Sequence, residues 1–137
     1  REDRRGRLWV ALNGDGLARL EDEAVAPGQS LFRRLRVSDD RPGSTVNAIR
    51  FDSEGRLWLG TERGIARAVE AQDGELAVEF LPESVACLNP QGACGTPDGA
   101  LWFVGARGLA CVRAGVLAQH ALPAPSVHPS TATCPNR

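Results

Sequence analysis

The stretch "GRLWLGTERGIARA", residues 55–68, contains the pattern from which the fold of this chain can be predicted. It begins on a glycine, places one of only three tryptophans between two leucines, and reaches another glycine six residues after that tryptophan. The pattern occurs twice more, as "GRLWVALNGDGLARL" at residues 6–20 and "GALWFVGARGLACV" at residues 99–112. Three copies in a chain of 137 residues indicate an internal repeat of one small structural unit.

The residues around each tryptophan alternate as they do in β-strands. In "RLWLGT" (56–61), two leucines face one way, while Trp58 and Gly60 face the other, which is typical of a strand buried on both faces. A short turn precedes each of the three strands, written "DRRG", "DSEG" and "TPDG". Such clusters supply the backbone geometry that a tight hairpin needs. The segments between turns are too short for helices.

The middle unit contains four such segments, at residues 44–52, 56–61, 64–70 and 76–82. Four short antiparallel strands in about 45 residues make a propeller blade, whose faces are buried only against neighbouring blades. We therefore predict an all-β chain of about three four-stranded β-propeller blades. The blades would occupy approximately residues 1–40, 41–84 and 85–125, followed by a tail at 126–137. Trp9, Trp58 and Trp102 are expected to fill the gaps between adjacent blades.

Residues 45–68, "TVNAIRFDSEGRLWLGTERGIARA", resemble the two-component regulator propeller repeat. That repeat occurs in the extracytoplasmic sensor regions of bacterial hybrid histidine kinases and diguanylate cyclases. Its pattern is a Val-x-x-Ile strand, an Asp-x-x-Gly turn, a Leu/Ile-Trp-Ile/Leu-Gly-Thr strand and Gly-Leu-x-Arg. The matching positions are Val46, Ile49, Asp52, Gly55, Trp58, Gly60, Thr61, Gly64 and Arg67. The first unit departs from the pattern at "VALNGD", and the third has "FVGA" without the threonine.

The resemblance implies a periplasmic or otherwise extracytoplasmic sensor segment of a bacterial signalling protein, with any kinase or cyclase domain outside this chain. The segment itself would be non-catalytic and would bind an unknown small-molecule, carbohydrate or protein ligand. The alternative is a stand-alone propeller that binds carbohydrate or protein, as a lectin or scaffold does. A propeller lyase or hydrolase is less favoured, because the chain has no tyrosine and no histidine cluster.

Composition limits the partners. The formal net charge is −1 and the arginines are mixed with acids, so no strong field favours nucleic acid. No run of about 18 apolar residues predicts insertion into a membrane. Methionine is absent, even at position 1, which suggests a processed or excised piece.

Three blades do not close a ring, since propellers typically have four to eight. Arg1 begins at the turn before a tryptophan strand, so the innermost strand of the first unit is expected to be missing. The tail ends in "TATCPNR" (131–137), which reads as another innermost strand running into a turn. The chain is therefore either part of a longer propeller or a homo-oligomer in which each copy lends this strand to a neighbour.

No catalytic, metal or cofactor signature is present. His120 lies on a predicted outer strand and His128 in a proline-rich tail, where surface positions are expected. The four cysteines lack the paired spacing of a structural zinc site, and "NGDG" at 13–16 lacks the further ligands that calcium requires. Cys87 and Cys94, separated by a proline and a glycine, either form a disulfide or remain small buried thiols.

Two further sets of residues recur at the turns and loops. Asp3, Asp52 and Asp98 lie at or near equivalent turns, where we expect them to stabilise the turn rather than to catalyse. Arg63 and Arg107 lie in the loop after the tryptophan strand. Equivalent loops of a ring converge on one rim, where these arginines would bind an anionic ligand or an acidic partner. The alternative is that both are ordinary solvated side chains.

Overall fold

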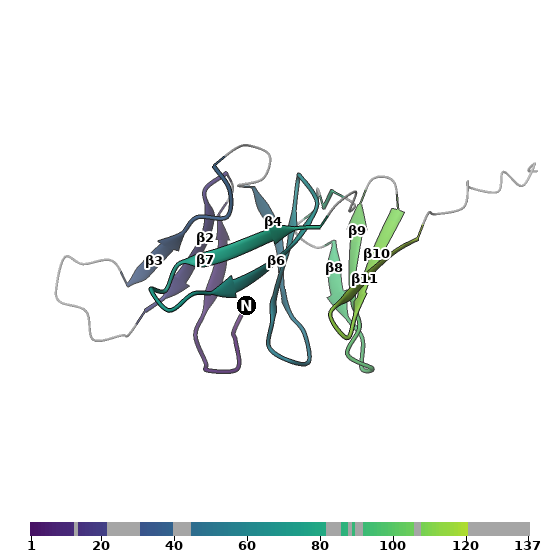
Figure 1. Cartoon of the computed structure of the whole chain (residues 1–137), viewed down its shortest axis with the longest axis horizontal. Helices are drawn as coiled ribbons and strands as arrows, with labels where there is room; N and C mark the ends of the chain where they lie inside the picture. Colours follow the sequence, from purple (N-terminus) through teal and green to yellow (C-terminus); the bar gives the residue numbers. More distant parts are fainter. Residues whose placement is uncertain are drawn as a thin grey trace, which may run out of the picture.

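The computed structural model describes residues 1–12, 14–21, 31–39, 45–81, 86–87, 89, 92–105 and 108–120. These residues form eleven β-strands and no helix, arranged as three antiparallel sheets with the second between the other two (Figure 1). No helix in the described part of the chain is long and apolar enough to cross a membrane. The predicted all-β architecture is confirmed.

Sheet 2 is the complete unit, with its strands in the order β4-β5-β6-β7. The strands are β4 (Val46–Phe51), β5 (Leu57–Thr61), β6 (Ile65–Glu70) and β7 (Leu76–Phe80). The turn from β4 to β5 is closed by a hydrogen bond of 2.9 Å from the Gly55 N–H to the Asp52 carbonyl. Gly55 adopts a φ of 81°, a left-handed conformation that favours glycine over residues with a Cβ. The sequence pattern therefore placed this turn correctly.

Sheet 3 has the same four-stranded order, from its inner strand β8 to its outer strand β11. Its strands are β8 (Ala93–Gly95), β9 (Leu101–Gly105), β10 (Gly108–Arg113) and β11 (Val116–His120). Along the inner side of the molecule, β1 contacts β4 and β4 contacts β8. The three sheets thus radiate from neighbouring inner strands, as blades do.

Sheet 1 has only three strands, in the order β1-β2-β3. They are β1 (Trp9–Leu12), β2 (Gly16–Leu20) and β3 (Phe32–Leu35). The inner strand is reduced to a short stub, in which an isolated bridge joins Glu2 to Leu8. Since this stub begins at Arg1, the first residue of the chain, the expectation that the first unit lacks its innermost strand stays a prediction.

The hydrophobic core lies between the sheets rather than within them. All five residues of β5 are buried. Leu57 and Leu59 pack in the cluster between sheets 1 and 2, while Trp58 packs with Phe103 between sheets 2 and 3. This is the two-faced alternation that the sequence predicted for the tryptophan strand.

The three tryptophans do not share one environment. Trp9 is 3% exposed and Trp58 is 1% exposed, each between two sheets as predicted. Trp102, on β9, is only partly buried, and its ring lies 5.6 Å from that of His120 on β11. Among the described residues no sheet lies beyond sheet 3, so the inter-blade position of Trp102 stays a prediction.

Candidate functional site

The strongest local constellation is the carboxylate that anchors each buried tryptophan. Asp52 accepts hydrogen bonds from the Trp58 Nε1–H at 2.9 Å and from the Arg56 Nε–H at 2.7 Å. Its other oxygen accepts the backbone N–H groups of Glu54 and Arg56, both at 2.9 Å. One carboxylate thus closes the turn and holds the indole that packs against sheet 3.

Asp3 repeats this arrangement in sheet 1. It accepts the Trp9 Nε1–H at 2.9 Å and the Arg7 Nε–H at 2.8 Å. Burial raises the pKa of both Asp3 and Asp52, but the hydrogen bonds from tryptophan, arginine and backbone outweigh it, so each pKa lies below its ordinary value. Both carboxylates are charged structural anchors, which agrees with the expected turn-stabilising role.

The third unit breaks the pattern. The position equivalent to Asp52 is Thr96, whose N–H donates to the Ala100 carbonyl at 2.9 Å. Asp98 lies two residues later, within hydrogen-bonding distance of Thr96, and forms an exposed ion pair of 2.8 Å with Arg113. Asp98 is therefore not the structural equivalent of the other two aspartates. The spacing of Asp, Arg and Trp at i, i+4 and i+6 is the sequence signal that separates them.

A second cluster joins sheets 1 and 2 around Trp9. The guanidinium groups of Arg7 and Arg19 lie 5.6 and 5.4 Å from the Trp9 ring centroid, a cation–π distance. Both guanidinium groups also form ion pairs with the carboxylate of Glu70 on β6. The distance from the Arg7 guanidinium to this carboxylate is 3.0 Å. Burial raises the pKa of Glu70, but the bonds from Arg7 and Arg19 outweigh it and lower the pKa. Sequence reasoning missed this cluster, whose only signal was the arginine in "GLAR" at residues 16–19.

The β1–β2 and β5–β6 loops, each of which joins a tryptophan strand to the next strand, lie along one side of the molecule, uppermost in Figure 1. Arg63 belongs to the β5–β6 loop and is exposed. Its guanidinium lies 4.5 Å from the ring centroid of Phe80, and its backbone N–H donates to the Thr61 Oγ1 at 3.2 Å. The predicted partner Arg107 lies outside the described residues. The described structure therefore places one of the two rim arginines, held against an aromatic ring.

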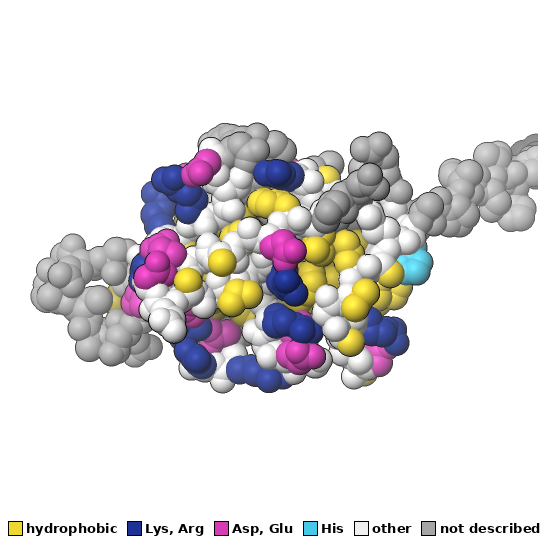
Figure 2. Space-filling model, viewed as in Figure 1, with side chains coloured by type: hydrophobic (Ala, Val, Ile, Leu, Met, Phe, Trp, Pro, Cys, Tyr) yellow, Lys and Arg dark blue, Asp and Glu magenta, His cyan; other side chains and the backbone are white. Residues whose placement is uncertain are grey.

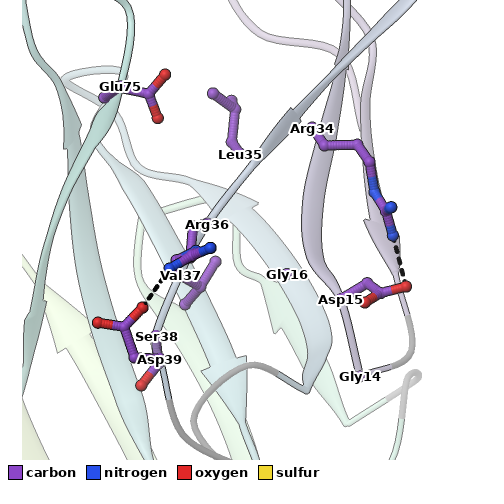
Figure 3. A pocket seen from close by; sticks show the side chains of 10 residues that line it. All are labelled: Gly14, Asp15, Gly16, Arg34, Leu35, Arg36, Val37, Ser38, Asp39 and Glu75. Carbon is purple, nitrogen blue, oxygen red and sulfur yellow. Dashed lines mark hydrogen bonds and ion pairs between the residues drawn. The ribbon is translucent and has the colours of Figure 1, made fainter.

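A hollow of about 580 Å³ lies on the same rim, beside the β1–β2 loop (Figure 3). Two exposed ion pairs cross its wall, Asp15–Arg34 at 2.5 Å and Arg36–Asp39 at 2.6 Å. The complete lining is Gly14, Asp15, Gly16, Arg34, Leu35, Arg36, Val37, Ser38, Asp39 and Glu75. Exposed ion pairs contribute little to stability, so their groups are free to exchange partners with a polar ligand. Arg63 does not line this hollow.

Both acidic and basic side chains line the hollow, and both also occur across the wider surface. Figure 2 shows basic and acidic side chains intermixed over the visible face. Most described arginines are paired with a carboxylate, such as Arg33 with Glu75 and Arg67 with Glu79. The described surface thus offers a polar site without a strong field of one sign.

The cysteines of the predicted disulfide are free thiols in this structure. Cys87 is fully buried between sheets 2 and 3, with its Sγ 3.6 Å from the Asn89 carbonyl oxygen, and burial raises its pKa. Cys94 is exposed on β8, opposite Trp102. Of the two alternatives that the sequence left open, the disulfide is not formed, and the buried thiol is found for Cys87 but not for Cys94, which faces outward.

Among the described residues, His120 lies apart from these groups. His120 is exposed beside Trp102, and His128 lies outside the described residues. The described part of the chain contains no group of three His, Cys, Asp or Glu side chains that could hold a metal ion.

Residues 40–63 match the two component regulator propeller family. The match covers β4, the Asp52 turn and β5, and it confirms the resemblance seen in the middle unit. A search of curated protein sequences found no match.

Solved structures confirm the fold. Virginiamycin B lyase from Staphylococcus aureus has a TM-score of 0.62 at 16% identity, over 91% of this chain and 41% of the lyase. A catalytically inactive form of that lyase with quinupristin has a TM-score of 0.59 at 22% identity, with the same two coverages. The extracellular domain of a putative hybrid two component system from B. thetaiotaomicron has a TM-score of 0.59 at 20% identity, over 88% of this chain and 16% of that one.

This chain spans less than half the length of each of these proteins. At such identities the likeness establishes the fold alone. The described residues form three propeller blades that do not close a ring.

Proposed function

We propose that this chain is a non-catalytic, ligand-binding propeller segment of the extracytoplasmic sensor region of a bacterial signalling protein. The observation that carries the proposal is the match of residues 40–63 to the two component regulator propeller family. The likeness to an extracellular domain of a hybrid two component system supports the same assignment. Propellers host many unrelated functions, so this family match carries more weight than the fold itself.

The described side chains favour binding over catalysis. The buried carboxylates Asp3 and Asp52 each accept a tryptophan, an arginine and backbone N–H groups, which leaves them committed to structure. Acid–base catalysis needs a proton donor or acceptor at a reachable position with a pKa near the working pH. The pKa of both aspartates is lowered instead. The likeness to virginiamycin B lyase concerns the fold alone and gives no support for a lyase activity of this chain.

The rim that carries Arg63 and the hollow of Figure 3 is the surface where we place ligand binding. Arg63 is exposed and already oriented by Phe80, so it presents a fixed cation at little further cost in side-chain entropy. The hollow beside the β1–β2 loop adds charged groups of both signs. A polar ligand with carboxylate and hydroxyl groups, such as an acidic oligosaccharide, fits this chemistry.

The sensor assignment is tested by the complete coding sequence that surrounds this chain. We expect a membrane-spanning segment and a histidine kinase or diguanylate cyclase domain in the same protein. A coding sequence that ends in a propeller without either would contradict the sensor proposal and favour a stand-alone binding propeller.

The binding surface is tested by calorimetric titration with oligogalacturonate, using a maltooligosaccharide as the neutral probe. We expect oligogalacturonate to bind and the Arg63→Glu, Arg107→Glu double variant to bind at least about tenfold more weakly, with an unchanged melting temperature. Arg4→Glu is the control, because Arg4 is an exposed arginine in the turn at the opposite end of the blade. Equal binding by both variants would remove the rim arginines from the proposed site.

A further inference from the structure

A second hollow, of about 350 Å³, lies between sheets 1 and 2. Two equivalent turns form its mouth, residues 3–6 before β1 and residues 52–55 before β5, both at the lower end of the molecule in Figure 1. The β5–β6 loop that carries Arg63 lies at the opposite end of β5. The hollow is therefore separate from the rim, and described residues of two neighbouring sheets form its walls.

The floor of this hollow is apolar. Trp9 of β1 and Phe51 of β4 meet there edge to face, with their ring centroids 6.2 Å apart. Leu57 and Leu76 of sheet 2 complete the floor and belong to the same cluster between the two sheets. Trp9 and Leu57 are buried, whereas Phe51 and Leu76 are only partly buried. The two partly buried side chains leave apolar surface that the hydrocarbon body of a ligand would cover.

The acidic groups of the lining are already paired. Asp3 and Glu70 hold the Arg7 guanidinium between them, at 2.8 and 3.0 Å. Glu54 pairs with Arg56 at 2.8 Å. Among the described residues, these three are the only carboxylates that line the hollow. Each has a cation beside it, so the charge that a ligand meets is determined by the remaining arginines of the lining.

Arg4 and Arg5 are the remaining arginines, and both are exposed in the turn at the mouth. The structure records no ion pair between either guanidinium and another residue that it describes. The Arg4 side chain crosses the mouth to the turn of sheet 2, where its Cδ lies 3.3 Å from the position that a Cβ on Gly55 would take. The absence of a side chain at Gly55 leaves room for this contact. Two cations without a carboxylate partner thus stand beside an apolar floor.

A ligand that matches this site has one anionic group and a compact apolar body. A guanidinium binds a carboxylate through two parallel N–H donors. The volume is near the lower end of the roughly 300–1,000 Å³ that is typical of small-molecule sites. An aromatic ring suits the floor better than a flexible alkyl chain, because it meets Phe51 edge to face and loses little conformational entropy. A chain of sugars would leave hydroxyl groups unpaired against this floor, so oligogalacturonate is not its ligand.

We propose that the hollow between sheets 1 and 2 binds a small aromatic carboxylate, with the carboxylate on Arg4 and Arg5 and the ring on Phe51 and Leu76. The site is additional to the rim and does not rest on the function proposed above. The ligand contacts both sheets at once, because the two arginines belong to sheet 1 and the two apolar side chains to sheet 2. Its binding therefore stabilises the junction between these sheets.

Calorimetric titration of the unmodified chain with 2-naphthoate tests the proposal, and we expect saturable binding. Two comparison ligands separate the two parts of the site. The neutral 2-naphthamide keeps the ring without the charge, and acetate keeps the charge without the ring. Each should bind at least about tenfold more weakly than 2-naphthoate. These titrations do not depend on the folding of a variant. Absence of saturable 2-naphthoate binding, or equal binding by either comparison ligand, overturns the proposal.

The Arg4→Gln, Arg5→Gln double variant locates the carboxylate. It should bind 2-naphthoate at least about tenfold more weakly than the unmodified chain, with an unchanged melting temperature. Arg67→Gln, Arg113→Gln is the matched control, because it removes the same two charges from surface arginines that do not line the hollow. This control should bind 2-naphthoate like the unmodified chain, and equal affinities of the two double variants overturn the proposal. Oligogalacturonate binding should be the same with and without the Arg4 and Arg5 substitutions, which separates this test from that of the rim.

Discussion

Replacement of Asp52 by alanine is the sharpest test of how each blade holds its tryptophan. The side chain of Asp52 is 5% exposed and accepts four hydrogen bonds, from Trp58 Nε1, Arg56 Nε and two backbone N–H groups. Asp52→Ala removes all four and leaves the indole N–H without its acceptor. Bonds to a charged group contribute about 1.5–3 kcal/mol each, but four that share one carboxylate are not additive.

A better estimate of the effect of Asp52→Ala comes from buried ion pairs, in which the loss of one partner costs about 3–5 kcal/mol. We expect Asp52→Ala to lower the free energy of unfolding by about this amount, a large share of a typical 5–15 kcal/mol. Urea denaturation followed by tryptophan fluorescence measures it. Asp98→Ala is the control, because Asp98 is exposed and its pair with Arg113 is worth about 1 kcal/mol or less. A cost below about 1 kcal/mol for Asp52→Ala, or equal costs for both variants, would refute the anchoring role.

The same carboxylates predict how stability depends on pH. The pKa values of Asp52 and Asp3 are lowered in the folded state. The contribution of these two groups to the free energy of unfolding is therefore fully present at a pH above 3.8, the ordinary pKa of an aspartate. It is lost as the pH falls from that value through the lowered pKa. Urea midpoints measured from pH 7 down to pH 2 should therefore decline mainly below pH 4. Asp52→Asn should flatten part of this decline, and an unchanged profile would argue against the shifted pKa.

Three further outcomes are expected. Trp58→Ala should lower the free energy of unfolding by about 3–5 kcal/mol in the same urea assay, because it empties the junction between sheets 2 and 3; a small loss would contradict that junction. Gly60→Ala should cost about 1–3 kcal/mol, since a Cβ at Gly60 would lie 2.9 Å from both the Cβ and the Sγ of Cys87; a melting temperature like that of the unmodified chain would show that Cys87 can move. Alkylation without reductant, read by mass spectrometry, should label exposed Cys94 rapidly and buried Cys87 only after unfolding; protection of both, removed by reductant, would establish the disulfide instead.

The repeating unit, the strands of its middle copy and the two faces of β5 could all be predicted from the sequence. These features depend on residues only a few positions apart. Alternation decides which side of a strand Leu57 and Trp58 occupy, and the left-handed turn requires a glycine such as Gly55. The anchoring of Trp58 by Asp52 is also local, because a hairpin brings residues at i and i+6 together. The spacing was visible in the sequence and separates Asp52 from Asp98.

Features that depend on distant segments became visible only in the three-dimensional structure. Glu70 reaches Arg19, 51 residues away, because sheets 1 and 2 pack face to face around Trp9. Trp102 has the same local sequence context as Trp58 but a different exposure, because burial requires a neighbouring sheet. Cys87 remains a thiol because its side chain is drawn into the core between sheets 2 and 3. Local pattern fixes which way a side chain points, whereas the packing of whole sheets determines what it meets there.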